Sequence, residues 1–375
     1  MNTDTPVNES PLFLLAVALV FLSAGIGIVL GPGNTFQIGL LSALLLAFLA
    51  IAGLSTLNAD LLSLSLRRFI SFVGLSILGF YMAKSLGLKQ GVKAIFLFTF
   101  LLSLLNILAV LTIPGDHISS AGEWEGILSH KNNLGRFSAL GGLTALYALV
   151  YGLVNRAVAF AALMCALTLL WMSDSATALV VFMVIGSLVF LLPLIKVHKS
   201  LFPLGIFIGF VVAGLLSVWV WSSWDVVLAS LGRDTTLTGR TFLWPAVWEA
   251  IQEKPLLGYG YRAFWVEGHS PAVEVWRQIG WQPKHAHMGY LELWLELGIV
   301  ALLLFFLLFA FSIGRATRLA RIQRDPIFRW VIVYLTFLFL TNVSESTLLI
   351  AYSPDWTLFV FILASLDMKQ HTMEA

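Results

Sequence analysis

The amino-acid sequence predicts an all-α polytopic membrane protein, and three observations support that prediction. Hydrophobic residues make up 59% of the 375-residue chain and charged residues only 11%, whereas soluble domains carry roughly 25% charged residues. The mean hydropathy is +0.91. The apolar residues also occur in continuous blocks of about 20, which is the length of a membrane-spanning helix. Strands of membrane β-barrels would alternate apolar and polar positions instead.

The apolar blocks predict about eleven membrane-spanning helices, within a range of 10 to 12. The first block follows a segment without Lys or Arg, which lacks the basic region of a cleavable signal peptide, so we expect 11–31 to be a retained helix. The third block begins at Arg67 and Arg68 and is therefore the least regular. The predicted spans are 11–31, 36–57, 66–86, 92–113, 132–153, 157–173, 176–195, 202–222, 288–313, 328–349 and 352–367.

The basic residues of the short loops predict the orientation, because such residues collect on the cytoplasmic side. Alternate loops contain Lys89 and Lys93, Arg156, Lys196 and Lys199, and a run from Arg315 to Arg324. We therefore place these loops in the cytoplasm and the loops 114–131 and 223–287 outside. Arg67 and Arg68 fall on the outer side and disagree with this rule.

The chain divides into N-terminal membrane helices (1–222), a large outer loop (223–287) and C-terminal membrane helices with a cytoplasmic tail (288–375). Within the loop, apolar residues recur at helical spacing from Leu243 to Ile251, with Trp244 and Trp248 one turn apart. Thr241 could cap this helix and Pro255 would end it. We expect the helix to lie along the membrane surface, where tryptophan rings settle at the headgroups.

Ionisable residues that a membrane helix seldom carries gather, under this topology, at the outer face. Such residues are costly at membrane depth, so each is a candidate for function, although any one alone could be an ion pair that holds helices together. The candidates of interest are Arg136, Arg233, Arg240, Arg262, His130, Lys131, His287, Asp174 and Glu345.

The chemistry of this set points to a phosphate-bearing ligand. Cations outnumber acids in it, and arginine is suited to multidentate contact with phosphate oxygens. The outer loop is also rich in Trp and Tyr, whose faces can stack on sugars. A lipid-linked saccharide diphosphate would meet both features, and nothing in the sequence suggests a nucleic-acid partner.

His287 is the candidate general base, because it lies where the loop re-enters the membrane and a neutral imidazole can accept a proton from a hydroxyl. His285 forms an H-x-H pair with it, which could indicate a metal site. No third and fourth ligand accompany the pair at a suitable spacing. We therefore predict no metal and no other cofactor, and interpret His285 as a solvated loop residue.

Three motifs resemble the O-antigen ligase and polymerase superfamily of bacterial membrane glycosyltransferases, and most closely its exopolysaccharide-polymerase branch. They are SHKNNLGR at 129–136, LGRDTTLTGRTFLW with PLLGYGYRAFW across 231–265, and AHMGYLELWLELG at 286–298. SDSATAL at 173–179 is a weaker fourth motif. The resemblance covers roughly residues 60 to 366.

The resemblance implies a helical bundle of the glycosyltransferase C type in the bacterial inner membrane, with an active site that faces the periplasm. It implies an inverting, metal-independent enzyme whose donor is an undecaprenyl-diphosphate-linked glycan. On this chain the family's base is His287 and its diphosphate ligand is Arg240, while Arg136 and Arg262 match basic positions of the same pocket. The family's usual Asn or Thr after the histidine is Met288 here.

We accordingly predict His287 and Arg240 to be catalytic. The predicted substrate-binding residues are Arg136, Arg262, Arg233, His130, Lys131, Glu345 and Asp174. The expected partners are the lipid-linked donor, a glycan acceptor, the lipid bilayer, and flippase and chain-length regulator proteins.

Three functions remain open on the sequence. The first is a polymerase that joins oligosaccharide repeat units, and the second is a ligase that transfers a finished glycan to a lipid A-core or protein acceptor. The third, a transporter, is disfavoured because the charged cluster lies at one face, whereas transporter sites lie at the bilayer midplane.

Overall fold

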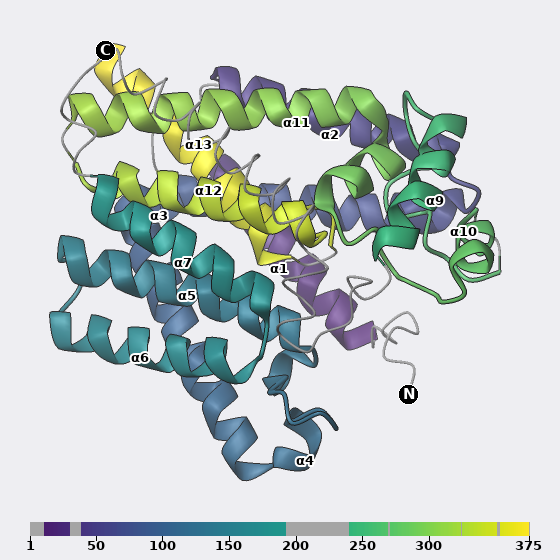
Figure 1. Ribbon diagram of the computed structural model, residues 1–375. Coiled ribbons are helices and arrows are strands. Elements are labelled where there is room, and N and C mark those ends of the chain that lie inside the picture. The colour runs from purple at the N-terminus through teal and green to yellow at the C-terminus, as the bar shows by residue number, and fades with distance from the viewer. Residues whose placement is uncertain are drawn as a thin grey trace.

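The computed structural model describes residues 11–30, 39–192, 240–268, 271–323, 325–350 and 353–374. In these ranges the regular elements are helices, apart from one isolated β-bridge between Ile118 and Trp124. Figure 1 shows them packed as a bundle. The helices are α1 (Pro11–Leu30), α2 (Leu40–Ser55), α3 (Leu62–Thr112), α4 (Pro114–His117), α5 (Lys131–Tyr151), α6 (Arg156–Met172), α7 (Ala176–Leu191), α9 (Arg240–Glu253), α10 (Ala272–Ile279), α11 (Gly289–Ile322), α12 (Ile327–Ser344) and α13 (Pro354–Glu374).

These helices follow the apolar blocks of the sequence, so the prediction of an all-α polytopic membrane protein is confirmed. Five helical segments in the described ranges are long and apolar enough to cross a membrane: Leu40–Asn58, α3, α5, α11 and α12. Shorter apolar helices lie in α1, α6 and α7. Helices suit these blocks because lipid offers no hydrogen-bond partner to the backbone. The predicted span 202–222 lies outside the described residues.

The third and fourth predicted spans are joined differently from our expectation of a loop around Lys89. Helix α3 runs through both spans, and Gly87 (φ 64°, ψ 170°) is its non-helical residue. Gly79 lies against Val360 and Gly91 against Phe361, although a straight helix would separate these two glycines by about 18 Å. The two halves of α3 therefore fold back at Gly87, which still allows each half to cross the membrane separately.

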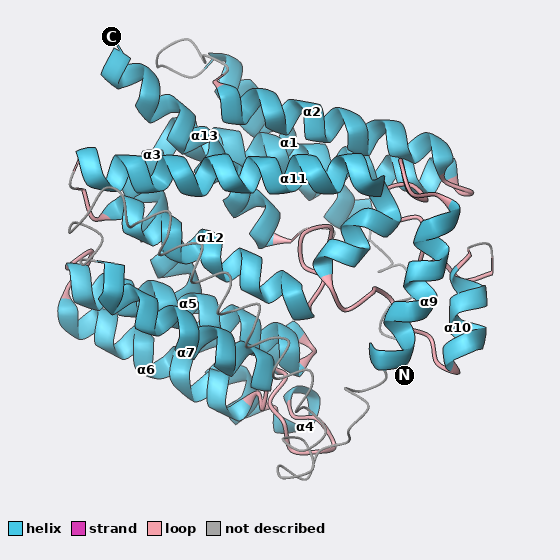
Figure 2. Cartoon of the chain, turned by 45° about the horizontal axis from the view of Figure 1, so that its top comes forward, coloured by secondary structure: helices cyan, strands magenta, loops and turns pink. Residues whose placement is uncertain are grey.

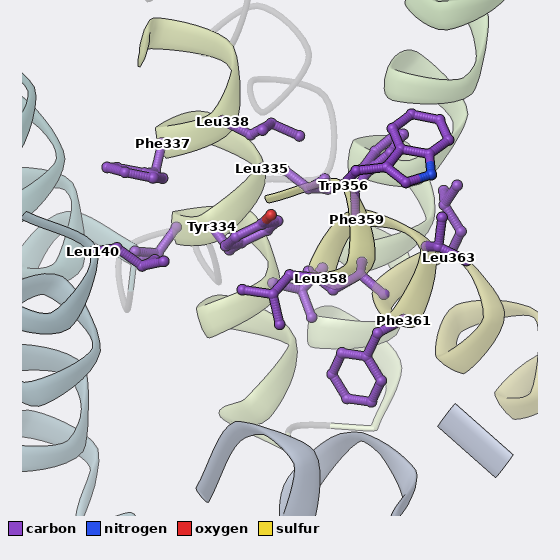
Figure 3. Packing of buried hydrophobic residues seen from close by; sticks show 14 of the residues in the cluster. Leu140, Tyr334, Leu335, Phe337, Leu338, Trp356, Leu358, Phe359, Phe361 and Leu363 are labelled. Carbon is purple, nitrogen blue, oxygen red and sulfur yellow. The ribbon is translucent and has the colours of Figure 1, made fainter. Parts of the chain in front are cut away.

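Helices α12 and α13 form the centre of the bundle. Figure 3 shows Tyr334 on the side of α12 that faces Leu358 of α13, whereas Phe337 lies on the opposite side of α12. Tyr334 and Phe337 are fully buried, as are Trp356 and Phe359 of α13. Lipid tails are as apolar as these residues, so close packing and hydrogen bonds must hold the helices together. The Trp356 indole N–H donates to the hydroxyl of Ser76, at 2.9 Å, which ties α13 to α3.

At one end of the bundle, residues 240–268 and 271–288 fold into a structure that we call the cap. Figure 2 shows α9 and α10 side by side there. The cap has its own apolar core, in which Leu243 and Val247 of α9 pack with Phe264 and with Trp276 of α10. The prediction of a helix before Pro255 is confirmed by α9, whereas its position along a membrane surface stays a prediction.

A break in α11 attaches the cap to the bundle. Gly298 adopts φ 82° and ψ 173°, a region open almost solely to glycine, and this frees carbonyl groups of the preceding turn. The backbone N–H groups of Tyr259 and Gly260 donate to the carbonyls of Leu295 and Glu296 at 3.0 and 2.9 Å. In return, Ile299 N–H donates to the Pro255 carbonyl at 2.9 Å. The helix break is thus compensated by hydrogen bonds to the cap.

Candidate active site

Four chain segments that are distant in sequence meet at the cap end of the bundle. Arg240 is the first residue of α9, Glu345 directly follows α12, Asn132 lies in the first turn of α5, and His287 lies two residues before α11. Backbone contact fixes two of these segments together, because Gly289 N–H donates to the Glu345 carbonyl at 3.1 Å. Helix termini leave backbone groups unpaired, which makes this junction a place where polar side chains can be held.

Glu345 is the centre of the polar contacts at this junction. Its Oε1 accepts from Arg240 Nη2 at 3.0 Å and from Asn132 Nδ2 at 3.1 Å. Ser175, which precedes α7, donates to Asn132 Oδ1 at 3.2 Å. The carboxylate therefore links α5, α7 and α9 to the end of α12.

Arg240 is held in a fixed orientation, but it keeps a donor unused. Its Nη1 donates to the Ser344 carbonyl at 2.7 Å, and its side chain is 13% exposed. Its Nε is buried and has no hydrogen-bond partner. An unpaired buried donor is unfavourable, so Arg240 has hydrogen-bonding capacity that its present contacts do not use.

His287 has a strained backbone and a buried ring edge. Its φ of 52° lies in the left-handed region, which is uncommon for residues other than glycine. Its backbone N–H donates to His285 Nδ1 at 3.2 Å, and the two rings lie 4.0 Å apart. The interpretation of His285 as a solvated loop residue is therefore wrong: it is half-buried and helps to set the conformation of His287.

The electrostatic surroundings of His287 keep its ring neutral. Burial, followed by the charges of His285, Arg240 and His130, lowers its pKa to about 2. The Oε2 atom of Glu345 lies 3.9 Å from His287 Nδ1 and acts in the opposite direction, but Arg240 already pairs with that carboxylate. Nδ1 is buried without a partner, while the side chain is 22% exposed, so substrates have access only through other atoms of the ring.

The residue before His287 is fixed from two sides. The indole N–H of Trp244, on α9, donates to the Ala286 carbonyl at 2.9 Å. The Ala286 N–H donates to Glu292 Oε2, on α11, at 2.5 Å. These contacts hold the loop that carries His287 between α9, which begins with Arg240, and α11, which follows His287.

Arg262 belongs to a second polar cluster, which centres on Glu292 and Glu296. Its backbone N–H donates to Glu296 Oε2 at 2.7 Å, and its carbonyl accepts from the Arg68 guanidinium. Trp265 Nε1 donates to Glu292 Oε1 at 2.9 Å. The hydrogen bond from Arg68 to the Arg262 carbonyl gives a physical reason for a basic residue at this end of the bundle. The rule that basic residues collect on the cytoplasmic side did not predict one there.

Sequence reasoning missed both carboxylates of this second cluster. Glu292 and Glu296 are 5% and 2% exposed, and they lie one helical turn apart in an apolar stretch. Ionisable residues in such a stretch are costly, and that signal could have identified them. Their roles in fixing Ala286 and Arg262 depend on loop contacts, which the sequence does not reveal.

The remaining predicted site residues lie around this junction without forming one constellation. Arg136 forms an ion pair with buried Asp355 and lines a narrow pocket that also contacts Glu345. Lys131 pairs with Glu123 at 2.6 Å. His130 caps α5 by accepting the Asn132 N–H at 3.2 Å, and Asp174 is exposed in the turn before α7 with a φ of 48°. Arg233 lies outside the described residues.

The chemistry available here is proton acceptance beside a preorganised cation. His287 presents a neutral imidazole, and Arg240 presents a guanidinium that is fixed by Glu345 and Ser344. In the described ranges no group of three or more His, Cys, Asp or Glu residues is arranged to hold a metal ion. Among the described residues, Arg240 is a cation that lies close to His287.

Comparison with known proteins connects this geometry to a family. Residues 160–306 match the family model described as O-antigen ligase. The exopolysaccharide production protein ExoQ of Rhizobium meliloti (strain 1021) is 30% identical over 221 residues, which are 56% of this chain and 51% of ExoQ. The predicted resemblance to the O-antigen ligase and polymerase superfamily is confirmed. The chain spans about half the length of this curated relative.

The range matched to the O-antigen ligase family contains the cap and the start of α11. Arg240, Arg262 and His287 lie inside that range, whereas Arg136 and Glu345 lie outside it. The contact between Arg240 and Glu345 therefore joins the matched segment to helices beyond it. The protein is a multi-pass membrane protein that is similar to a ligase and polymerase superfamily, and its individual reaction is a separate question.

Proposed function

We propose that this protein is an inverting, metal-independent glycosyltransferase that polymerises undecaprenyl-diphosphate-linked oligosaccharide repeat units into an extracellular polysaccharide or O-antigen. The observation that carries the proposal is the position of Arg240 beside His287 at the junction of the cap and the bundle. One residue binds anions and the other accepts protons, which are the two functions that glycosyl transfer from a diphosphate requires.

The chemistry is a displacement at the anomeric carbon of the donor. The hydroxyl oxygen of the acceptor sugar attacks that carbon from the face opposite the diphosphate, and the bond between carbon and phosphate oxygen breaks. His287 takes the hydroxyl proton, a role worth about 10²–10⁴-fold. Arg240 stabilises the negative charge on the departing diphosphate, as preorganised donors do elsewhere.

The surroundings of His287 also suit a sugar. The ring of Trp281 lies 6.1 Å from that of His287, and an aromatic face can stack on a sugar ring. The proposed location is the bacterial inner membrane with the cap in the periplasm, where the lipid-linked donor and the glycan acceptor would meet. Flippase and chain-length regulator proteins are the proposed partners.

The second candidate is an O-antigen ligase that transfers a lipid-linked glycan to a lipid A-core or protein acceptor. The description of the matched family model favours it, whereas the name of the curated relative refers to exopolysaccharide production. Both reactions would use the same donor chemistry and differ in the acceptor.

The lipid-linked intermediate that accumulates in cells lacking the protein distinguishes the two candidate functions. We expect a single repeat unit to accumulate on the lipid carrier, measured by mass spectrometry of extracted lipids, because a polymerase acts on single units. Full-length polymer on the carrier would instead support the ligase. Reintroduced His287→Ala should fail to relieve the accumulation, while Glu274→Gln, an exposed change on α10, should relieve it. Relief by His287→Ala would refute the proposed base.

A further inference from the structure

The two carboxylate oxygens of Glu345 face different groups, the guanidinium of Arg240 and the imidazole of His287. Its Oε1 is engaged by Arg240 at 3.0 Å, while its Oε2 lies 3.9 Å from His287 Nδ1, beyond hydrogen-bond distance. Both of these residues are half-buried, and each has one buried nitrogen without a hydrogen-bond partner, Nε of Arg240 and Nδ1 of His287. One carboxylate thus lies between a cation that it neutralises and an imidazole that it does not reach.

Burial is the main reason that His287 is a poor base in the free site, and the ion pair of Glu345 with Arg240 leaves this effect uncompensated. A histidine accepts a proton at Nε2 more readily when a carboxylate accepts the hydrogen bond from its Nδ1–H. In the free protein the charges that face His287 are those of Arg240 on α9, His285 in its own loop, His130 before α5 and Glu345 after α12. The single negative charge among them is already paired with Arg240.

A bound diphosphate would compete with Glu345 for Arg240. Its oxygens match the guanidinium fork better than one carboxylate oxygen does, and the unpaired Nε of Arg240 offers a further donor to them. When Arg240 turns to the diphosphate, Glu345 loses its cationic partner. Asn132 still donates to Oε1, so the carboxylate stays at the junction, and a shift of about 1 Å brings Oε2 within hydrogen-bond distance of His287.

We propose that Glu345 is a positioning residue that switches partner from Arg240 to His287 when the diphosphate of the donor binds. The His287 Nδ1–H then donates to Glu345, and Nε2 takes the proton of the acceptor hydroxyl as the new glycosidic bond forms and the electron pair leaves with the diphosphate. The base is thereby activated only when a donor is present. This inference rests on the proposed function, since it assumes a diphosphate donor and His287 as base.

The first test measures the pKa of His287 by NMR, with polyprenyl diphosphate lacking a glycan as the probe. In the wild-type protein we expect the probe to raise this pKa. The negative charge of the probe acts directly on the ring as well, and Glu345→Gln keeps that direct effect while removing the carboxylate. The rise should therefore be at least one unit larger in the wild type than in Glu345→Gln. Equal rises in the two proteins would overturn the switch.

The second test compares kinetic constants of the reconstituted protein. Glu345→Gln should lower kcat by on the order of 10²–10⁴-fold, by analogy with loss of the carboxylate behind a catalytic histidine, while the KM for the donor stays equal or falls because Arg240 has lost a competitor. A merely structural role in holding Arg240 would raise KM instead. Glu274→Gln, exposed on α10, serves as the matched control.

The outcomes separate this inference from the proposed function. A wild-type protein that transfers no glycan, or a His287→Ala variant that keeps its turnover, contradicts the proposed function. Wild-type turnover that depends on His287 together with an unchanged kcat for Glu345→Gln contradicts only the switch. If Glu345→Gln does not fold, Asn132→Ala replaces it in the NMR test. This variant removes the hydrogen bond from Asn132 to Glu345 Oε1, so the probe-induced rise in the pKa of His287 should differ in size from that of the wild type. An unchanged rise would count against the switch.

Discussion

At the scale of single residues, His287 combines an unfavourable backbone conformation with a half-buried ring. A left-handed φ in a non-glycine residue costs of order 1–3 kcal/mol, and its φ of 52° is maintained by the contact to His285 and by the fixed peptide of Ala286. Among the described residues, Ser129, Asp174 and Arg262 are the other non-glycine residues with positive φ. All four lie in loops at the cap end, which is the end that we propose to be functional.

The lowered pKa of His287 predicts a pH dependence of stability. Its pKa falls from an ordinary 6.5 to about 2 on folding, so below pH 6.5 the unfolded chain binds a proton that the folded chain does not. Stability is therefore retained above pH 6.5 and lost as pH falls toward 2, by at most about 1.4 kcal/mol per pH unit. Thermal unfolding in detergent from pH 8 to pH 5 should show the wild type losing more stability than His287→Gln. A difference between the two proteins that does not vary with pH would contradict this.

The fork of Arg240 gives a second prediction at the residue scale. Its two terminal nitrogens contact different acceptors, Ser344 and Glu345, and a lysine ammonium cannot reproduce that planar geometry. Arg240→Lys should bind polyprenyl diphosphate at least about tenfold more weakly, and Arg240→Ala more weakly still, as measured by titration in nanodiscs. Arg277→Lys, exposed on α10, should bind normally. Near-normal affinity of Arg240→Lys would exclude a bidentate phosphate contact.

At the scale of elements, the break in α11 is the feature on which the cap depends. Hydrogen bonds that a continuous helix would form internally go to the segment 255–260 instead. An added Cβ at Gly298 would lie 2.0 Å from the Leu256 carbonyl oxygen. The loop and the helix therefore approach at a distance that only glycine permits. The position of His287, eleven residues before Gly298, depends on that approach.

Two glycines of α11 provide a matched test of this break. Gly298→Ala should destabilise the protein by several kcal/mol, of order 3, because backbone strain and a steric clash add. Gly314→Ala lies in the regular part of the same helix with nothing within 4 Å, and it should be neutral or stabilising by up to about 1 kcal/mol. Thermal unfolding of both variants compares them. Equal effects would show that the break at Gly298 is not needed.

At the scale of the whole molecule, charge is distributed between the two ends of the bundle. The contacts of Arg240, Arg136 and Arg262 lie at the cap end, whereas Arg315 of α11 pairs with Asp367 of α13 at 2.7 Å near the other end of these helices. Helix α12 begins at Ile327, shortly after the basic stretch that includes Arg318, and ends at Ser344, directly before Glu345. The cluster of candidate residues and the basic loop that we predict to be cytoplasmic therefore lie at opposite ends of α12.

This separation predicts which end is accessible from outside. In a Cys165→Ala background, a cysteine at Val273 on α10, which is 47% exposed, should react with an impermeant thiol reagent in intact spheroplasts. A cysteine at Arg318, which is exposed on α11, should react only after permeabilisation. The reverse pattern would place the cap in the cytoplasm and would contradict the proposed periplasmic site.

The sequence by itself determined the helices and the residue types of the candidate site. A helix in lipid must be apolar over about 20 residues and must satisfy its own backbone, so composition and block length are enough to locate α2, α5 and α12. The same cost makes charged residues in or beside such blocks conspicuous, which is why Arg240, His287 and Glu345 could be selected before their positions were known.

Only the tertiary structure decided which of these residues meet. Glu345 lies 105 residues from Arg240 in sequence yet accepts its hydrogen bond. The backbone N–H of Arg262, only 22 positions beyond Arg240, donates to Glu296 instead. Side-chain charge acts over a few ångströms, so partners are chosen by how helix ends and loops pack. That packing depends on local features such as the break at Gly298, whose effect on loop position cannot be read from hydropathy.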